Sequence, residues 1–362
     1  MNSMPNNATP EIKDEFKAMR SVEGPLDRVV AVSGFLLGLF HLYTGFFGSF
    51  SAMNQRGVHW TVMSVMIFIL YPASKASYKR VTLSDYLWGA GAALSGLYIL
   101  LSWSRIAENA GVTNTTDIIM GLIAVAVVIE ATRRVVGTVL AMLGLCFLLY
   151  AYFGAWIPGT LGHRRYSIER IIQFIYASAE GIYGIPMAVS AQYAVLFVIF
   201  GVVLEKFGGG KLFVDLVFSL TGRLRGGPAK ASVISSALFG TVSGSAVANV
   251  VVDGVFTIPL MKRSGYKPHV AGAIEAVTST GGQIMPPVMG AAAFIMAEIT
   301  GIQYVDICKA AALPAILYFF SLFMIVDLEA AKEKIGRISS VSEVMNMKTV
   351  LKFILKKIFR IF

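Results

Sequence analysis

Two polar interruptions of apolar sequence hold the residues best suited to bind a ligand. The first is GTVSGSAVAN at 240–249, which offers the hydroxyl groups of Ser243 and Ser245, the backbone of Gly244 and the amide of Asn249. In a bilayer an irregular backbone leaves N–H and C=O groups without water, so it persists only where protein buries it or where it lines a cavity. Hydroxyl and carbonyl oxygens at such a point can bind a small hard cation or part of a polar substrate.

The second interruption is TSTGGQIMPPVMG at 278–290. It contributes Thr280, Gly281, Gly282, Pro286 and Pro287. A continuous helix is not expected here, because proline lacks an N–H donor and disfavours the helical conformation of the residue before it. Secondary transporters bind substrate and coupling ions at broken helices near the middle of the bilayer. The two breaks therefore predict a transport site, and the alternative is that small residues only allow helices to pack closely.

The composition predicts the medium in which these breaks lie. The chain of 362 residues is 56% hydrophobic and 14% charged, with a mean hydropathy of +0.69. This is more apolar than a soluble domain of that length. The apolar runs do not alternate as strands do, and they approach the length of about 20 residues that a helix needs to cross a bilayer. We expect an all-α polytopic membrane protein.

The net charge of +10 is carried in short segments between the apolar runs, as in cytoplasmic loops. Anionic lipid headgroups, rather than nucleic acid, are the expected partners of these cations. The loops that contain Lys75, Lys79 and Arg80, and then Arg133 and Arg134, are the most basic. They are predicted to face the cytoplasm together with the N-terminus.

The remaining sequence predicts the helices and domains that must position the two breaks. Helices are expected at 29–51, 58–74, 84–104, 117–132, 139–157, 167–182 and 187–204. Residues 232–259 predict a re-entrant hairpin with its tip at 243–245, residues 270–300 a helix broken in two, and residues 310–326 a further span. The expected domains are a cytoplasmic leader at 1–27, a first helical domain at 28–160, a domain with both breaks at 161–331 and a basic tail at 332–362 that could anchor at the membrane surface.

Other residues that could do chemistry lack the spacing for it. Cys146 and Cys308 have no second Cys or His at the spacing of a metal site. The turn EKFGGGKLF is not a phosphate loop, because no glycine stands five positions before Gly210 and Leu212 replaces the Ser or Thr that would bind Mg²⁺. Glu130 is expected to form a structural ion pair with Arg133 or Arg134. Neither His41 nor His59 is assigned to a site. No cofactor is expected.

At these residues the chain resembles the membrane permease of the tripartite ATP-independent periplasmic (TRAP) transporters. The runs TGRLRGGPAK, GTVSGSAVANV, FTIPLMKRSGY and STGGQIMPPVMGAAAFIMAE carry the resemblance, which is closest to the TAXI branch. Residues 28–160 resemble the family's small subunit more loosely. A fused permease of small and large subunits is thus implied.

The resemblance implies an elevator-type, multi-pass transporter of the bacterial inner membrane. It is driven by Na⁺ and receives a small organic anion from a periplasmic solute-binding protein. It implies that the hairpin tip at Ser243, Gly244 and Ser245 and the break at Gly281 and Gly282, with Pro286 and Pro287, hold one Na⁺ and part of the substrate. The Na⁺ is the coupling ion, expected at Ser243, Ser245, Gly281 and Gly282. Dicarboxylates, 2-oxo acids and amino acids all remain open as substrates.

Two departures from the family pattern bear on this expectation. Val252 and Asp253 stand where the family usually carries small hydroxyl residues, which adds a carboxylate beside the hairpin. The large subunit is built from two inverted repeats, and only the first hairpin and the first broken helix are recognisable here. The sequence thus predicts a truncated permease that is inactive alone, and a non-transporting remnant or scaffold is the alternative.

A distant alternative is an intramembrane serine protease that uses Ser243 or Ser245 with His269. The 16 residues from Ser245 to Met261 would span about 24 Å as a helix. A catalytic base must reach within about 3 Å of its nucleophile. The sequence spacing therefore argues against the protease.

Overall fold

The computed structural model describes residues 19–20, 22–48, 50–74, 77–78, 80–109, 111–207, 216–222 and 224–336. Within these ranges every regular element is helical, which confirms the predicted all-α class. The leader at 1–18, Lys75, Lys79, the glycine-rich turn at 208–211 and the tail at 337–362, for which predictions were made above, lie outside the described residues. The chain divides into two units, Met1–Gln192 and Tyr193–Phe362, and each is described by itself.

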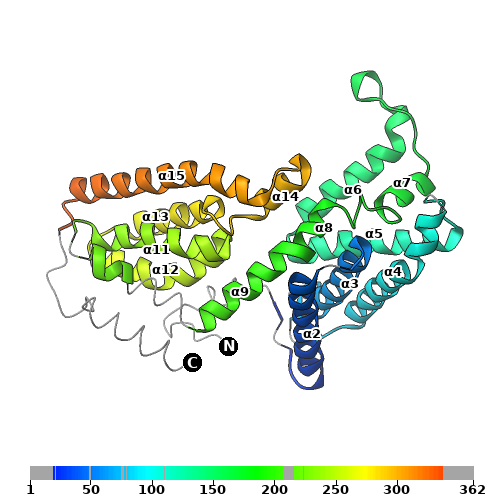
Figure 1. Ribbon diagram of the computed structural model, residues 1–362, viewed down its shortest axis with the longest axis horizontal. Helices are drawn as coiled ribbons and strands as arrows, with labels where there is room; N and C mark the ends of the chain where they lie inside the picture. The colour runs from blue at the N-terminus through cyan, green and yellow to red at the C-terminus, as the bar shows by residue number, and fades with distance from the viewer. Residues whose placement is uncertain are drawn as a thin grey trace. The chain divides into compact units, whose positions relative to one another are not determined.

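The first unit begins with five long helices (Figure 1). They are α2 (Pro25–Phe47), α3 (Ala52–Leu70), α4 (Leu83–Glu108), α5 (Thr115–Val135) and α6 (Thr138–Phe153). Two short 3₁₀ turns follow, at Gly154–Trp156 and Gly159–Leu161. They lead to the short α-helices α7 (Ile168–Ile175) and α8 (Ile185–Val189) and to a π-helical turn at Ser190–Ala194. The helix expected at 167–182 is therefore shorter than predicted, because the chain turns after Tyr176 and reaches Gly184 without a regular element.

Polar residues at the helix starts explain where these helices begin. Asn114 caps α5 by accepting a hydrogen bond from the backbone N–H of Asp117, while the Asp117 carboxylate accepts from the N–H of Asn114. Thr82 and Asp85 form the same reciprocal arrangement at α4. Such capping boxes satisfy backbone donors that a helix leaves free in its first turn.

Five helices in the described part of the chain are long and apolar enough to cross a membrane. They are Pro25–Phe47, Leu83–Glu108, Thr138–Trp156, Ile185–Leu204 and Tyr304–Lys332. Helices α3 and α5, which the sequence also predicted as apolar, do not belong to this set. In α3 the first turns carry Asn54, Gln55 and Arg56, which lower its hydropathy.

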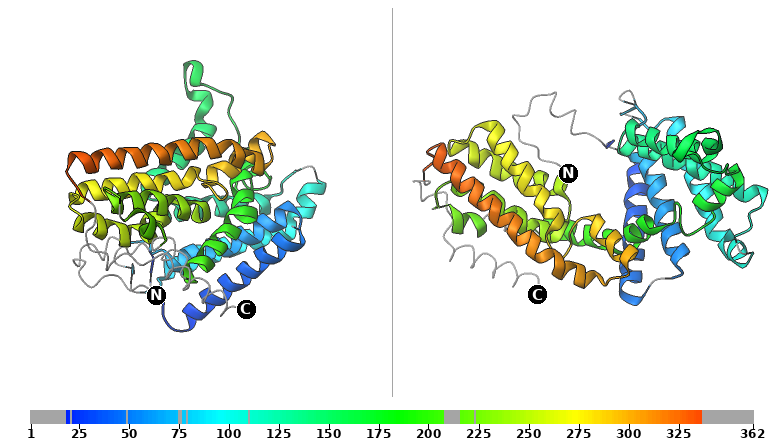
Figure 2. Two further views of the ribbon diagram at one scale, coloured as in Figure 1. Left: turned by 60° about the vertical axis from the view of Figure 1, so that its left-hand side comes forward. Right: turned by 90° about the horizontal axis from the view of Figure 1, so that it is seen from above.

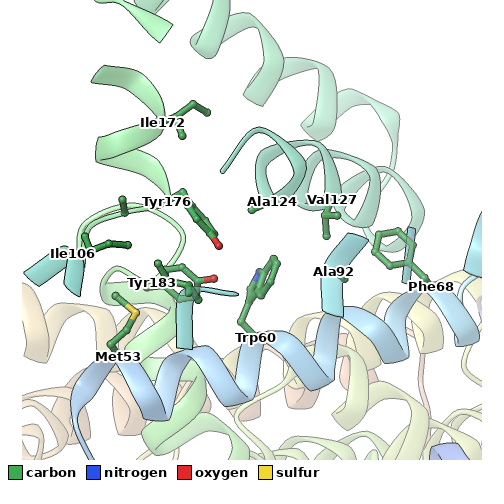
Figure 3. Packing of buried hydrophobic residues seen from close by; sticks show 12 residues of the cluster. Met53, Trp60, Phe68, Ala92, Ile106, Ala124, Val127, Ile172, Tyr176 and Tyr183 are labelled. Carbon is green, nitrogen blue, oxygen red and sulfur yellow. The ribbon is translucent and has the colours of Figure 1, made fainter. Parts of the chain in front are cut away.

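Aromatic residues form the centre of the first unit's core. In Figure 3 the rings of Trp60, Tyr176 and Tyr183 lie near one another, with Met53 and Ile106 close by. The centroids of Trp60 and Tyr183 are 5.9 Å apart, and those of Tyr176 and Tyr183 are 6.1 Å apart. This packing joins α3 to the turn after α7, although more than a hundred residues separate them in the sequence.

A buried ion network ties the first turn of α4 to the end of α5 and to Arg20, which precedes α2. The Asp85 carboxylate accepts from Arg20 Nη2 at 2.9 Å and from Arg134 Nη1 at 2.6 Å, and all three side chains are buried. Glu130 pairs with both Arg133 and Arg134, at 2.7 and 2.8 Å, which confirms the ion pair predicted from the sequence.

The second unit contains both predicted breaks. Its helices are α9 (Val195–Lys206), α11 (Gly227–Ser243), α12 (Ala246–Arg263), α13 (Pro268–Gly281), α14 (Ala291–Thr300) and α15 (Tyr304–Lys332), with a 3₁₀ turn at Gly282–Ile284. Helices α11, α12 and α13 pack against one another, and α15 lies along α11 and α13. Figures 1 and 2 show this order, with α15 beside α13.

A charged trio fixes α11 to α15. Lys230 Nζ donates to Asp327 Oδ1 at 2.6 Å, and Arg225 donates to the other oxygen of the same carboxylate. The Lys230 side chain is 7% exposed, whereas that of Arg225 is 48% exposed. The buried lysine thus has its counter-ion on the neighbouring helix.

Candidate functional site

The first break is a two-residue turn between antiparallel helices. Helix α11 ends at Ser243, Gly244 adopts a left-handed conformation with φ +58°, and Ser245 is the N-cap of α12. The Ser245 hydroxyl accepts a hydrogen bond from the N–H of Ala248 at 3.3 Å. Glycine is required at such a turn because residues with a Cβ are strained at positive φ. The predicted hairpin tip is therefore present as a helix–turn–helix.

The second break separates α13 from α14 by nine residues of irregular backbone and 3₁₀ turn, 282–290. The peptide bond between Pro286 and Pro287 is cis. The N–H of Gly290 donates to the carbonyl of Gln283 at 2.7 Å, which closes the loop on itself. The hydroxyl of Tyr304 lies 2.6 Å from the carbonyl oxygen of Val288, so α15 holds this loop as well.

The two breaks meet in space. A Cβ added to Gly244 would clash with the carbonyl oxygen of Met289, so the hairpin tip lies directly on the backbone of the second break. One turn earlier in α11, Gly240 is in backbone contact with Gly282. The sequence predicted that both breaks contribute to one site; the backbone contacts bring the two breaks together, and the site itself stays a prediction.

Asn249 is the buried polar side chain at this junction. It is fully buried, and its Nδ2 donates to the carbonyl oxygen of Ser236 at 3.0 Å. A Cβ added to Gly282 would lie 3.0 Å from the same amide nitrogen. Within the described residues its Oδ1 has no hydrogen-bond partner. A buried carbonyl oxygen without a donor is costly, and a cation would satisfy it.

The other predicted residues differ in their accessibility. Ser243 is half-buried and Ser245 is exposed, so their hydroxyl groups are open to a ligand at the tip. Thr280 is exposed, and its hydroxyl donates to the carbonyl of Ala276 on its own helix at 2.7 Å. The structure thus does not draw Thr280 into the junction. A Cβ added to Gly281 would meet the rings of Tyr318 and Phe319 on α15, whereas Gly282 faces the hairpin.

Sequence reasoning singled out Asp253 but missed the rest of a layer of buried polar residues below the tip. Asp253 on α12 and Glu275 on α13 are 2% and 0% exposed. Their hydrogen-bond partners are hydroxyl groups on α11, α12 and α13. The partners are Ser232, Ser235, Ser236, Thr257 and Ser279. The spacing of Ser232, Ser235 and Ser236 on one face of a helix was the signal that could have found this layer.

The residues proposed for a protease do not come together. His269 is exposed near the start of α13. In the part of the chain that the structure describes, it makes no hydrogen bond with Ser243 or Ser245. No group of three or more His, Cys, Asp or Glu side chains that could hold a metal ion occurs among the described residues.

Comparison with known proteins identifies the family to which these breaks belong. Residues 123–362 match the family model of the tripartite ATP-independent periplasmic transporter, DctM component. This range contains both breaks and the buried polar layer beneath them. No solved structure matches the chain.

Curated relatives resemble shorter stretches of the chain. The C4-dicarboxylate TRAP transporter large permease protein DctM of Pseudomonas aeruginosa is 28% identical over 146 residues, which are 40% of this chain and 34% of that protein. The isethionate TRAP transporter permease protein DctMQ of Oleidesulfovibrio alaskensis is 30% identical over 122 residues, 33% of this chain and 18% of that protein. The ectoine TRAP transporter large permease protein TeaC of Halomonas elongata is 25% identical over 131 residues, 36% of this chain and 31% of that protein.

The matched stretches span about a third or less of the curated relatives' own length. The family model, by contrast, covers more than half of this chain. TRAP permeases are transporters rather than enzymes, which removes the protease alternative. The chain therefore belongs to the DctM family of large permease components of bacterial TRAP transporters, which are multi-pass membrane proteins.

Proposed function

We propose that this chain is the membrane component of a Na⁺-driven secondary transporter that takes up a small organic anion. The observation that carries the proposal is the contact of the hairpin tip at Gly244 with the backbone of Met289 in the second break. It joins two interruptions of helical backbone at one point of a membrane protein. Irregular backbone in that position is characteristic of transport sites.

The junction fits a sodium ion. Na⁺ is a hard cation that prefers oxygen ligands, and the junction offers hydroxyl groups, backbone carbonyls and one unpaired amide oxygen. We propose Ser243, Ser245, Gly281 and Gly282 as the residues that hold the ion, with Asn249 Oδ1 as a further ligand. The unpaired Oδ1 supports this assignment, because it is buried and lacks a donor in the described residues.

The substrate is proposed to bind beside the ion as an anion. Helices α12 and α14 both begin at the breaks, at Ala246 and Ala291. The N-terminus of a helix carries a partial positive charge and free N–H groups, which favour a carboxylate or sulfonate. The names of two relatives, which refer to C4-dicarboxylate and isethionate, are consistent with an anionic substrate. Pro286 and Pro287 are proposed to border the substrate, because the prolines prevent a continuous helix through the second break.

The proposed partner is a periplasmic solute-binding protein of the TAXI type that delivers the substrate. We also propose that residues 28–160 correspond to the small TRAP subunit fused to the large one, although the family match already begins at residue 123. Both proposals are tested by binding of purified proteins to the chain in nanodiscs. Binding of a TAXI-type protein and no binding of a separate small subunit are expected; strong binding of a separate small subunit would count against the fusion.

The Na⁺ site is tested by the ion's effect on stability. A ligand that binds only the folded state raises the melting temperature as its concentration increases. The purified full chain should melt at a higher temperature in NaCl than in equal KCl or choline chloride. Ser245→Ala and Asn249→Ala should each reduce that difference. Ser264→Ala is the matched control, because the Ser264 hydroxyl donates to Leu260 at the far end of α12.

Two outcomes would refute the Na⁺ site. One is a melting temperature that does not respond to NaCl beyond the response to KCl. The other is an equal Na⁺ response in wild type, Ser245→Ala and Asn249→Ala. In either case the breaks only permit close helix packing, and a scaffold without transport activity becomes the better interpretation.

A further inference from the structure

The α11–α12–α13 assembly contains two carboxyl groups that the proposed Na⁺ site does not use. Asp253 and Glu275 are 2% and 0% exposed, and they project from neighbouring helices into the same layer. An ionisable side chain in the interior of a membrane protein is costly and is usually functional. The structure shows in detail what surrounds each of them.

Asp253 is surrounded by serine hydroxyl groups of α11. Ser235 Oγ lies 2.8 and 2.6 Å from the two carboxyl oxygens, and Ser236 Oγ lies 2.9 Å from Oδ2. The same Ser235 hydroxyl lies 2.7 Å from the carbonyl oxygen of Ala231. A serine has a single hydroxyl proton, so it cannot donate to all three acceptors at once. A proton on Asp253 would let the carboxyl group donate to Ser235 while Ser235 donates to Ala231.

Glu275 has an equivalent environment. Thr257 Oγ1 lies 2.5 Å and Ser232 Oγ lies 2.9 Å from its Oε2, while Ser279 Oγ lies 3.1 Å from its Oε1. Thr278 Oγ1 is 3.2 Å from Ser232 Oγ. Every side-chain partner of Glu275 is therefore a neutral hydroxyl group.

Hydroxyl groups also connect the two carboxyl groups. From Asp253 Oδ2 the path runs to Ser236 Oγ at 2.9 Å, then to Thr278 Oγ1 at 3.4 Å. From Thr278 it continues to Ser232 Oγ at 3.2 Å and to Glu275 Oε2 at 2.9 Å. Such a chain can pass a proton by reorienting hydroxyl groups, so the two carboxyl groups behave as one site.

No cationic side chain in the described residues bonds either carboxyl group. On α11 the nearest charge in sequence is Lys230, and its Nζ is engaged by Asp327 of α15. On α15 the Tyr318 hydroxyl donates to the carbonyl of Val277 instead. The other titratable or charged side chains of α12, α13 and α15 lie toward the helix ends: Lys262, Arg263, His269, Tyr304, Asp306, Cys308, Lys309, Glu329 and Lys332. The turn at Gly282–Ile284 carries none.

We propose that Asp253 and Glu275 form a proton-binding site, in which the pair holds at least one proton at neutral pH. Two buried negative charges that share a layer without a counter-ion are strongly unfavourable, and a carboxylate in this position is neutralised by binding a proton. The proton converts one carboxylate into a carboxylic acid that donates a hydrogen bond to a serine or threonine hydroxyl. The occupant of the site is thus a proton rather than a metal ion.

The proton site goes beyond the proposed Na⁺-driven uptake and does not depend on it. If the proposed function holds, the assembly that carries the substrate also carries this proton. The transporter would then have a protonation step in addition to its Na⁺ step. Because binding of a proton can be detected without transport, failure of the uptake proposal would not affect the test.

The test is infrared spectroscopy of the full chain in nanodiscs at neutral pH. A protonated carboxylic acid has a C=O stretching band that ionised carboxylates lack, and the band shifts when H₂O is replaced by D₂O. Wild type should show this band, and Asp253→Asn or Glu275→Gln should remove or shift it. Asp306→Asn is the matched control, because Asp306 is exposed and paired with Lys309, and it should leave the band unchanged.

The measurement distinguishes three outcomes. A deuterium-sensitive band that both variants alter and the control keeps supports the proton site. A wild-type spectrum without the band, or a band that neither variant alters, overturns it. A band that disappears on adding NaCl also overturns it, because a metal ion would then displace the proton. The wild-type measurements in H₂O, D₂O and NaCl need no variant, so poor folding of one variant does not remove the test.

Discussion

Gly240 and Gly282 bring the backbones of α11 and the second break into direct contact. A Cβ added to Gly240 would lie 2.5 Å from the Cα of Gly282, and one added to Gly282 would lie 3.0 Å from the Cα of Gly240. Neither position can accept a side chain without moving backbone. The contact is the point at which the hairpin and the broken helix hold each other.

Replacing Gly240 with alanine should therefore destabilise the protein. Overpacking of this kind costs about 1–3 kcal/mol. Gly282→Val should cost more, because its larger side chain must also displace Asn249. The measurement is the free energy of unfolding in mixed micelles. Gly272→Ala is the control: it lies in α13 with open space around it, and it should be neutral or slightly stabilising. Equal stability of Gly240→Ala and Gly272→Ala would contradict the contact.

Asp85→Ala should be one of the most destabilising changes in the first unit. It would leave the buried Arg20 without a carboxylate partner and Arg134 with Glu130 alone. Breaking a buried ion pair in this way costs about 3–5 kcal/mol. Thermal unfolding of the full chain measures the effect. Asp306→Ala, which removes an exposed pair with Lys309, should change the melting temperature little. A small effect of Asp85→Ala would show that the guanidinium groups find other partners.

The trio of Lys230, Arg225 and Asp327 should respond unequally to mutation. Asp327→Asn removes the counter-ion of Lys230, whose side chain is buried, and should lower the melting temperature clearly. Arg225→Gln should have a much smaller effect, because Arg225 is about half exposed and Lys230 keeps its partner. The double variant Lys230→Met with Asp327→Leu should recover part of the loss. Equal effects of the two single variants would contradict this order.

The orientation in the membrane is predicted from the basic loops and stays a prediction. In a background with Cys146 and Cys308 replaced by serine, a cysteine at Tyr78 should not react with an impermeant maleimide added from the periplasm. A cysteine at Val112, at the other end of α4, should react, because α4 is long enough to cross the bilayer once. The reverse labelling pattern would invert the topology.

The helices and their interruptions could be predicted because each has a local cause. Pro286 and Pro287 remove backbone donors, and Gly244 permits a left-handed turn, so the positions of both breaks follow from a few adjacent residues. The ion pair of Glu130 with Arg133 and Arg134 was predictable for the same reason, since they are three and four residues apart on one helix.

The buried polar layer could not be predicted in this way. Glu275 accepts a hydrogen bond from Ser232, which is 43 residues away in the sequence, and only the packing of α13 on α11 brings the two side chains together. The first unit has a comparable network: His41 Nε2 lies 2.9 Å from His59 Nδ1, and His59 Nε2 lies 3.0 Å from the Ser190 hydroxyl. Neither histidine was assigned a role from the sequence, because nothing near His59 in the chain indicates that it contacts Ser190, 131 residues away.

The left-handed turn at Gly244 also limits how a gene for this protein can vary. Each amino acid that a single nucleotide change can put in place of glycine carries a Cβ, which would be strained at φ +58° and would clash with the Met289 carbonyl. Ser243 and Ser245, on either side, are half-buried and exposed. Three adjacent codons therefore differ in what constrains them: the outer two are constrained by the ligand that their hydroxyl groups are proposed to bind, while the central one is constrained by the backbone alone.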